Sequence, residues 1–271
     1  MGKERLDVLL VKRNLVDSRE KAKRLIMAGL VFSENERLDK PGMKVDESIP
    51  LHLKETLRYV GRGGYKLERA LKSFETSIAG KTVVDIGSST GGFTDCALQN
   101  DATQVYAIDV GYNQLAWKLR SDERVHVHER TNFRYVTEEL FEHGLPNYAT
   151  IDVSFISLRL ILPVLKKILQ ENSEVIALVK PQFEAERNQV GKKGIVRDPR
   201  IHKEVLENII HFSQDEGFQF LNVTFSPITG SEGNIEYLIH LGWNNINKKK
   251  TTENVESLIT SVVEEAHRTL N

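Results

Sequence analysis

Short aliphatic runs alternate with amphipathic stretches along most of the chain. After residue 65, runs rich in Val, Ile and Leu predict buried strands, and segments with apolar residues three and four positions apart predict helices. This alternation predicts an α/β fold in which seven strands form a mixed, mostly parallel sheet with helices on both faces. We expect strands at 82–86, 104–109, 124–128, 148–153, 174–180, 218–225 and 235–241, and helices at 65–74, 91–99, 113–120, 158–169 and 201–216.

The N-terminal part of the chain follows a different pattern, which predicts a small α+β domain. A helix over 19–28 begins after Asp17 or Ser18, either of which can cap it, and ends at Gly29. Short β-like runs follow the helix, separated by a Pro-Gly turn signal. One face of the helix is apolar, and Arg19 lies on another face, four residues before a second cation.

The domain boundaries follow from glycine content and loss of periodicity. A Gly-rich linker separates the two patterned regions, and a tail that contains a polar amphipathic helix over 251–270 follows the last strand. The stretch 183–199 is long for a loop in a compact domain, which is typical of a lid or a substrate loop. We expect a small domain at 1–56, a linker at 57–64, the large domain at 65–245 and the tail at 246–271.

Charge is distributed unevenly, although the chain of 271 residues has a net charge of only −1. Its 40% hydrophobic and 28% charged residues are ordinary for a globular protein. Residues 1–72 contain 17 Lys and Arg against 11 Asp and Glu, and the remainder contains 20 against 27. A basic N-terminal region favours a polyanionic partner. Charge alone is equally compatible with an uninvolved solvated surface.

Several features argue against secretion, membrane insertion and metal binding. Cys96 is the single cysteine, which excludes an intrachain disulfide and suits a reducing compartment. The longest apolar run, 160–165, falls far short of the ~20 residues that span a bilayer. His126 and His128 share a strand face but lack a third ligand at metal-binding spacing. We therefore expect a soluble cytoplasmic protein with no membrane partner and no metal.

The first predicted strand of the large domain runs into a glycine-rich loop that opens a helix. Glycines let a backbone approach a ligand closely, and a helix N-terminus attracts a carboxylate. Asp109 ends the next strand, 24 residues after Asp85, where an acid can accept both hydroxyls of an adenosine ribose. The loop lacks GxGxxG spacing, so the pattern favours S-adenosylmethionine over a dinucleotide or a mere packing turn. The expected cofactor-binding residues are Asp85, Gly87, Ser88, Ser89, Thr90, Gly91, Gly92, Phe93, Asp109 and Asn132, where Asn132 is equally compatible with a turn-forming role.

Four charged residues stand at strand ends or lead into the core fold, where α/β sheets place their chemistry: Lys66, Asp152, Lys180 and Glu236. Each alone is compatible with a structural ion pair. Together they suit a reaction in which a ribose 2′-hydroxyl loses its proton while it attacks a sulfonium methyl group. We expect Lys180 to be the base or the hydroxyl-orienting group, held by Asp152, while Lys66 and Glu236 position the hydroxyl.

Rival methyl-transfer chemistries leave marks that this sequence lacks. Amino-group methyltransferases commonly carry Asn/Asp-Pro-Pro-aromatic after the fourth strand, and residues 152–155 are Asp-Val-Ser-Phe. Attack on a pyrimidine ring carbon requires a cysteine nucleophile, and we interpret Cys96 as a small buried residue. We interpret Trp117 and Trp243 as packing residues rather than base-stacking platforms.

Six motifs carry a further signal: Gly61–Leu67, Asp85–Asp95, Asp109–Tyr112, Asp152–Leu158, Val179–Glu184 and Glu232–Glu236. Together they resemble the TlyA family, whose members act as ribosomal RNA cytidine-2′-O-methyltransferases. The resemblance implies a Rossmann-like methyltransferase domain similar to the FtsJ group, with a Lys-Asp-Lys-Glu tetrad at Lys66, Asp152, Lys180 and Glu236. Glu232 lies close enough in sequence to leave the fourth member open.

Near the N-terminus stand Arg5–Asp7 and Ser18–Ala22. These segments resemble the α-L RNA-binding domain of a small-subunit ribosomal protein and several pseudouridine synthases. The resemblance implies ribosomal RNA or ribosomal subunits as partners, with no obligate protein partner. Basic side chains there would contact phosphates, which position an enzyme without reading sequence. The expected RNA-binding residues are Arg5, Ser18, Arg19, Lys23 and Arg62, and each basic one is also compatible with a solvated surface charge.

Two alternatives belong to other functional classes. Members of the family are often labelled hemolysin A, which suggests a membrane-acting hemolysin, although no spanning segment is present. A non-catalytic RNA-binding factor for ribosome assembly would keep the fold, and the intact tetrad argues against it.

Overall fold

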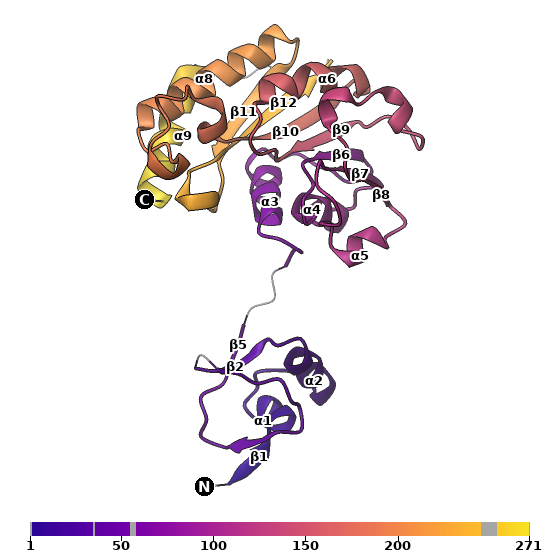
Figure 1. Ribbon diagram of the computed structural model, residues 1–271, viewed down its shortest axis with the longest axis vertical. Coiled ribbons are helices and arrows are strands. Elements are labelled where there is room, and N and C mark those ends of the chain that lie inside the picture. Colours follow the sequence, from indigo (N-terminus) through magenta and orange to yellow (C-terminus); the bar gives the residue numbers. More distant parts are fainter. Residues whose placement is uncertain (1, 35, 55–57, 245–253, 271) are drawn as a thin grey trace. The chain divides into compact units, whose positions relative to one another are not determined.

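The computed structural model describes residues 2–34, 36–54, 58–244 and 254–270, and the chain forms two compact units, residues 1–58 and 59–271 (Figure 1). The division falls inside the stretch expected as a linker, of which residue 57 lies outside the described residues. Tyr59 is only 1% exposed and packs in the core of the larger unit, and Gly63 already begins a helix. Most of the expected linker is therefore part of the larger unit.

The smaller unit is a helix pair with short strands, as its sequence pattern predicts. Ser18 caps the second helix by accepting a hydrogen bond from the Lys21 N–H, and Gly29 follows its end with φ of +70°. The apolar faces of both helices meet in a core that includes Leu10 and Ile26. The elements are β1 (Lys3–Arg5), α1 (Leu6–Lys12), α2 (Arg19–Met27), β2 (Val31–Ser33), β3 (Glu36–Arg37), β4 (Lys44–Asp46) and β5 (His52–Leu53).

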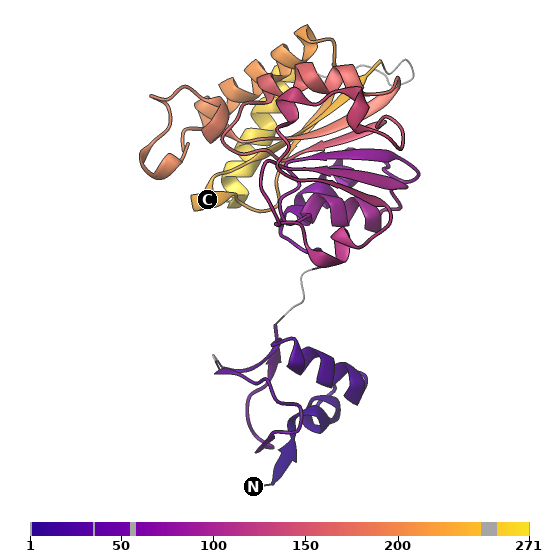
Figure 2. The ribbon, with the colours of Figure 1, turned by 45° about the vertical axis from the view of Figure 1, so that its right-hand side comes forward.

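A seven-stranded sheet in the order β11-β12-β10-β9-β6-β7-β8 forms the middle layer of the larger unit (Figures 1 and 2). β12 is antiparallel to both of its neighbours, and the remaining pairs are parallel. The mixed, mostly parallel sheet is confirmed, and every strand end lies within two residues of its predicted position. The strands are β6 (Thr82–Ile86), β7 (Gln104–Ile108), β8 (Val125–His128), β9 (Tyr148–Ile151), β10 (Ser173–Val179), β11 (Gln219–Phe225) and β12 (Tyr237–Trp243).

Helices cover both faces of this sheet and bury two apolar cores (Figures 1 and 2). On one face lie α3 (Gly63–Ser73), α4 (Gly92–Gln99) and α5 (Trp117–Arg120). On the other lie α6 (Leu162–Ile168), α8 (Pro199–Asp215) and α9 (Val255–Leu270). A short helix, α7 (Pro181–Glu184), follows β10 directly. This layering leaves the carboxyl ends of the parallel strands at one edge, where such folds bind ligands.

Two expected helices are shorter or divided in the structure. Of the helix expected over 113–120, only α5 forms. The Glu129 carboxylate accepts hydrogen bonds from the N–H groups of Asn113 (2.8 Å) and Gln114 (3.0 Å) and so holds these residues in a loop. The helix expected over 158–169 is a 3₁₀ turn followed by α6. Pro163 lies in the first turn of α6, where a missing N–H costs nothing.

The tail expected at 246–271 contains the predicted amphipathic helix, α9, but this helix packs into the larger unit instead of forming a separate polar segment. Residues 246–253 of that expected tail lie outside the described residues. In α9, Ile259 and Ala266 are fully buried in the core that also contains β11 and α8. The apolar stripe of α9 therefore packs in this core.

No helix within the described ranges combines the length and the apolar character needed to cross a bilayer.

Candidate active site

The glycine loop after β6 lies directly against the end of β9. Gly87 has φ of +84°, and a Cβ there would lie 2.5 Å from the carbonyl oxygen of Asp152. A side chain at this position would therefore push the two segments apart. Gly92, at the start of α4, similarly approaches the backbone of Gly63 and Gly64. The glycines thus bring the loop, α3 and Asp152 to one place.

One cavity of about 440 Å³ lies beyond the ends of β6, β7 and β9. Asp109 and Asn132 supply polar groups to it, and Val110, Phe133 and Ile156 supply apolar wall. The Asp109 carboxylate accepts hydrogen bonds from the N–H groups of Ser89 (2.8 Å) and Gly111 (2.7 Å). A carboxylate has about four acceptor positions, so capacity remains for two ligand hydroxyls.

Asn132 lines the same cavity, and the oxygen of its side-chain amide already has a hydrogen-bond partner. Its Oδ1 accepts a hydrogen bond from the Arg134 N–H at 3.1 Å, so it also forms a local turn. The two roles left open by the sequence are therefore compatible, because the NH₂ group is still available as a donor.

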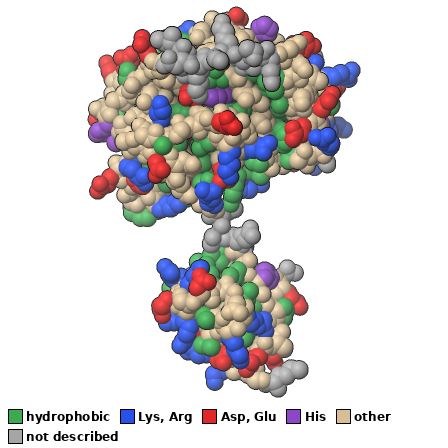
Figure 3. Space-filling model, turned by 180° about the vertical axis from the view of Figure 1, so that it is seen from behind, with side chains coloured by type: hydrophobic (Ala, Val, Ile, Leu, Met, Phe, Trp, Pro, Cys, Tyr) green, Lys and Arg blue, Asp and Glu red, His purple; other side chains and the backbone are tan. Residues whose placement is uncertain are grey.

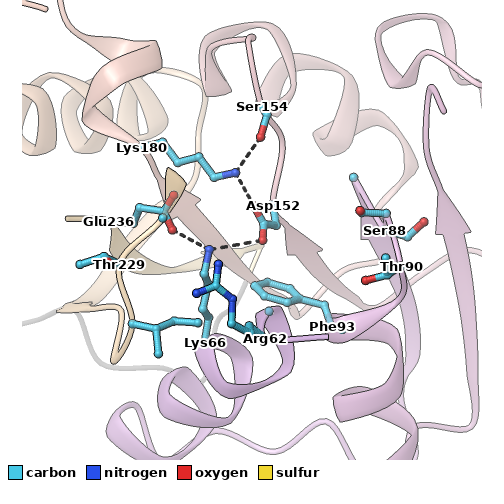
Figure 4. A pocket seen from close by; sticks show the side chains of 16 residues that line it. Arg62, Lys66, Ser88, Thr90, Phe93, Asp152, Ser154, Lys180, Thr229 and Glu236 are labelled. Carbon is cyan, nitrogen blue, oxygen red and sulfur yellow. Dashed lines mark hydrogen bonds and ion pairs between the residues drawn. The ribbon is translucent and has the colours of Figure 1, made fainter. Parts of the chain in front are cut away.

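A second cavity of about 300 Å³ adjoins the first and contains the four charged residues expected to act together (Figure 4). Gly87, Ser89, Asp152 and Ser154 line both cavities. The shared lining makes them neighbouring parts of one site.

The four charges form an unbroken alternating series. Glu236 Oε2 lies 2.5 Å from Lys66 Nζ, Lys66 Nζ lies 3.8 Å from Asp152 Oδ2, and Asp152 Oδ1 lies 2.6 Å from Lys180 Nζ. Figure 4 shows both lysines directed at Asp152 from different elements. The series joins α3, the end of β9, the end of β10 and the residue before β12. The structure therefore assembles all four, as the sequence predicts.

The series is largely removed from water. Lys66 and Lys180 are each 8% exposed and Glu236 is 2% exposed. Burying ionised groups costs several kcal/mol each unless partners compensate, so an alternating series is the arrangement that the interior tolerates. A purely structural ion pair needs no opening to solvent, whereas all four of these side chains line the cavity.

The structure distinguishes the two glutamates that the sequence leaves open. Glu236 contacts Lys66, whereas Glu232 is exposed in the preceding turn. Gly230 lies against the Glu236 carboxylate so closely that no Cβ fits there. Glu236 is the member of the charged series.

Ser154 contacts Lys180, which the sequence analysis does not predict. Its Oγ accepts a hydrogen bond from Lys180 Nζ at 2.9 Å. A signal was available, because residues two apart on extended backbone point the same way and Ser154 follows Asp152 by two.

Two of the expected cofactor-binding residues do not reach either cavity. Asp85 is fully buried and accepts hydrogen bonds from the hydroxyls of Thr94 (2.6 Å) and Thr150 (2.9 Å), and burial raises its pKa to about 6. It joins α4 to β9 beneath the loop. Gly91 faces Leu115 and Leu119 instead. The remaining six residues of the loop line the second cavity: Gly87, Ser88, Ser89, Thr90, Gly92 and Phe93.

Three of the five expected RNA-binding residues form ion pairs within the smaller unit. Arg5 and Arg19 both pair with the fully buried Asp7 at 3.0 Å, and the hydrogen bonds lower the pKa of that carboxyl to about 2. Lys23 pairs with Glu20, also at 3.0 Å. Figure 3 shows Lys and Arg side chains spread over one face of this unit, several beside Asp or Glu. These pairs leave about half of each arginine side chain exposed.

Arg62 belongs to the larger unit and lines the cavity that holds the tetrad (Figure 4). Ser18 serves as the cap of α2.

The two tryptophans differ. Trp243 packs against Phe218, as expected, but the expectation that Trp117 is a packing residue is wrong, because it is 78% exposed. Cys96 is fully buried, as expected. In the part of the chain that the structure describes, no group of three His, Cys, Asp or Glu side chains is arranged to hold a metal ion.

Comparison with known families accounts for both units. A model described as FtsJ-like methyltransferase matches residues 59–243, and one described as S4 domain matches residues 4–48. The chain therefore belongs to the FtsJ-like methyltransferase family, in which S-adenosylmethionine is the methyl donor, and it carries an RNA-binding S4 domain.

Similar proteins confirm the resemblance to TlyA. The 16S/23S rRNA (cytidine-2′-O)-methyltransferase TlyA of Mycobacterium tuberculosis is 40% identical over 88% of this chain and 89% of its own. A Bacillus subtilis protein, provisionally named an rRNA methyltransferase, is 63% identical over 99% of this chain and 95% of its own. A solved structure from Streptococcus thermophilus, provisionally named a hemolysin, is 53% identical with a TM-score of 0.75, and covers 99% of this chain and 97% of its own.

Proposed function

We propose that this protein transfers a methyl group from S-adenosylmethionine to a ribose 2′-hydroxyl of ribosomal RNA. The observation that carries the proposal is the buried series Glu236–Lys66–Asp152–Lys180 lining a cavity next to the one that contains Asp109. The name of the M. tuberculosis relative supports cytidine as the nucleoside. A ribosomal substrate implies that the enzyme works in the cytoplasm.

The larger cavity suits the donor. Its apolar wall fits a flat base, and the Asp109 carboxylate has acceptor positions left for the ribose hydroxyls. The close approach of Gly87 to Asp152 keeps the space between loop and strand free of side chains. When bound, S-adenosylmethionine supplies an electrophilic methyl group on a sulfonium centre. Asp109, Asn132 and the loop residues Gly87–Thr90 would hold it.

Lys180 is the side chain that contacts the acceptor hydroxyl in this proposal. It acts as the base when neutral and as a hydrogen-bond donor when charged. Asp152 and Ser154 occupy two directions around its Nζ atom, at 2.6 and 2.9 Å, which leaves the third for the hydroxyl. Lys66, held by Glu236, places a second cation beside the same site, where it stabilises negative charge on the attacking oxygen.

The S4 domain and Arg62 would bring the RNA to this site. Phosphate contacts from half-exposed cations position an RNA without reading its sequence. Arg62 lies beside the tetrad, so it would contact a phosphate near the target nucleotide. Ribosomal subunits are the proposed partners, since ribosomal RNA is folded within them.

The direct test uses purified protein, methyl-labelled S-adenosylmethionine and ribosomal subunits. We expect label in ribosomal RNA as a 2′-O-methyl nucleoside, and calorimetry should show donor binding. Donor binding without transfer to free RNA, to either subunit or to intact ribosomes would contradict the proposal and favour a non-catalytic factor.

A further inference from the structure

Glu184 ends α7, the short helix that begins directly after Lys180. Its Oε2 accepts a hydrogen bond from Ser157 Oγ at 2.5 Å, and its Oε1 accepts one from the Leu158 N–H at 2.8 Å. Ser157 and Leu158 end the loop that follows β9 and begins with Asp152. Glu184 therefore joins the loop after β10 to the loop after β9.

The segment 180–184 contacts the loop 152–158 at its beginning, middle and end. At the beginning, Lys180 contacts Asp152 and Ser154. In the middle, the rings of Phe183 and Phe155 lie 4.9 Å apart between centroids. At the end, Glu184 holds the loop through the two hydrogen bonds just described. Two of the four tetrad members thus lie on segments whose separation Glu184 fixes.

The loop itself has a conformation that needs such support. Phe155 has φ of +62°, a left-handed conformation that bulky side chains rarely adopt, and the residue is 90% exposed. Backbone strain of this kind persists only where neighbouring contacts hold it. Glu184 makes two side-chain hydrogen bonds at the far end of the loop, where Ser157 Oγ also accepts one from the Arg159 N–H at 3.1 Å.

Glu184 makes these contacts at a cost. Burial raises the pKa of its carboxyl above the ordinary value, although both hydrogen bonds favour the ionised form. An apolar residue at this position would avoid desolvating a carboxylate but would provide no acceptor for Ser157 or Leu158. The acceptor pair is therefore the property that distinguishes glutamate here.

We infer that Glu184 is a positioning residue for methyl transfer, which fixes the loop 152–158 so that Asp152 and Ser154 keep their places around Lys180. The inference rests on the proposed function. Glu184 lines neither cavity and contacts no tetrad side chain, so its effect is exerted through the loop.

The test compares Glu184→Ala and Glu184→Gln with Glu186→Ala, which removes an exposed carboxylate two residues further along. We expect Glu184→Ala to lower kcat by about tenfold to a hundredfold, since small misplacements of reacting groups have effects of this size. KM for donor and RNA should change less than threefold. Glu184→Gln should recover most of kcat, because its carbonyl can accept from Leu158 and its NH₂ can donate to Ser157 Oγ.

Amide hydrogen exchange gives a readout that requires no activity. We expect faster exchange at residues 154–158 in Glu184→Ala and unchanged exchange in the strands of the sheet. If Glu184→Ala does not fold, Ser157→Ala carries the test with a smaller fall in kcat and the same local increase in exchange.

The inference is overturned if Glu184→Ala keeps wild-type kcat, or if the loss only follows the folded fraction. It is also overturned if exchange at 154–158 stays unchanged. An inactive wild-type protein would instead contradict the proposed function, and the exchange result would still decide whether Glu184 holds the loop.

Discussion

A network of ion pairs in the smaller unit can be compared with the charged series in the larger unit. In the smaller unit, the buried Asp7 is held by two arginines, Arg5 and Arg19, whose side chains are about half exposed. In the larger unit, the lysines of the tetrad are each 8% exposed and face a cavity together with their carboxylates. The first network keeps its cations at a surface, where they can meet a polyanion. The second holds its charges away from water, where hydrogen bonds and charges act most strongly on a reacting group.

The largest expected effect is at Lys180. Lys180→Met should lower the rate of methyl transfer by 10²- to 10⁴-fold, roughly the contribution of a positioned acid–base group. Donor binding should change little, and the melting temperature should fall because Asp152 loses a partner, so circular dichroism must show that the variant is folded at the assay temperature. Lys167→Met, which removes an exposed lysine at the end of α6, is the matched control and should leave the rate unchanged. Wild-type turnover by the Lys180 variant would remove the functional distinction between the two networks.

The next effect separates the two neighbouring glutamates. Glu236→Gln removes the charge that holds Lys66 and should lower kcat by about tenfold or more, on the scale of a charged buried hydrogen bond of ~1.5–3 kcal/mol. Glu232→Gln alters an exposed side chain and should change kcat less than twofold. Steady-state kinetics on ribosomal subunits would measure both, and equal losses would contradict the assignment.

A third effect concerns donor affinity rather than turnover. Asp109→Asn should weaken binding of S-adenosylmethionine about tenfold to a hundredfold, because the amide cannot accept from two N–H groups and two ribose hydroxyls. Isothermal titration gives the change in Kd. Glu123→Gln, at an exposed site, is the control, and similar Kd values for both variants would exclude the ribose role.

In the smaller unit the effects should be graded and dependent on salt. Lys23→Gln should weaken RNA binding only a few-fold and reduce the slope of log K against log salt by about one. Lys23 is a cleaner probe than Arg19, because Arg19 also stabilises Asp7. Filter binding across a salt series would measure the slope, and an unchanged slope would remove Lys23 from the RNA surface.

The smallest effect is a difference in pH dependence between the units. The pKa of Asp7 is lowered to about 2 by Arg5 and Arg19, so its stabilisation is present above pH 3.8 and is lost as pH falls through about 2. The pKa of Asp85 is raised to about 6 by burial, so its contribution is present below pH 3.8 and is lost as pH rises through about 6.

Asp7→Asn should therefore remove a gain in the stability of the smaller unit as pH rises. Asp85→Asn should remove a loss in the stability of the larger unit as pH rises. Hydrogen exchange in α1 and α2 reports the smaller unit, and the fluorescence of Trp117 and Trp243 reports the larger. If both substitutions changed the slope of stability against pH in the same direction, the account would be contradicted.

Much of the fold could be predicted from the sequence because a parallel sheet buries nearly continuous aliphatic runs, and these mark β6 to β12 within two residues. The tetrad was predicted because strand ends in such a sheet meet at one edge. The contact between Lys66 and Glu236 could be expected only from the family resemblance, because the two residues are 170 positions apart and nothing local indicates that they meet.

The features that the sequence did not reveal depend on three-dimensional neighbours. The Asp85 carboxylate accepts hydrogen bonds from Thr94 and Thr150 beneath the loop. Its place at the end of a strand is equally compatible with a ligand contact, so the sequence does not reveal this role. Glu184 becomes meaningful only once Ser157 lies beside it. Glu129 holds the residues before α5 in a loop, and Trp117, the first residue of that short helix, is exposed.

The most direct test of the central claim is a map of 2′-O-methylated nucleotides in ribosomal RNA by mass spectrometry. It would compare cells with the gene, without it, and with the gene carrying Lys180→Met. We predict at least one 2′-O-methyl nucleotide, a cytidine, that is present only with the wild-type gene. An identical map in all three strains would contradict the assignment of this protein as a ribose methyltransferase.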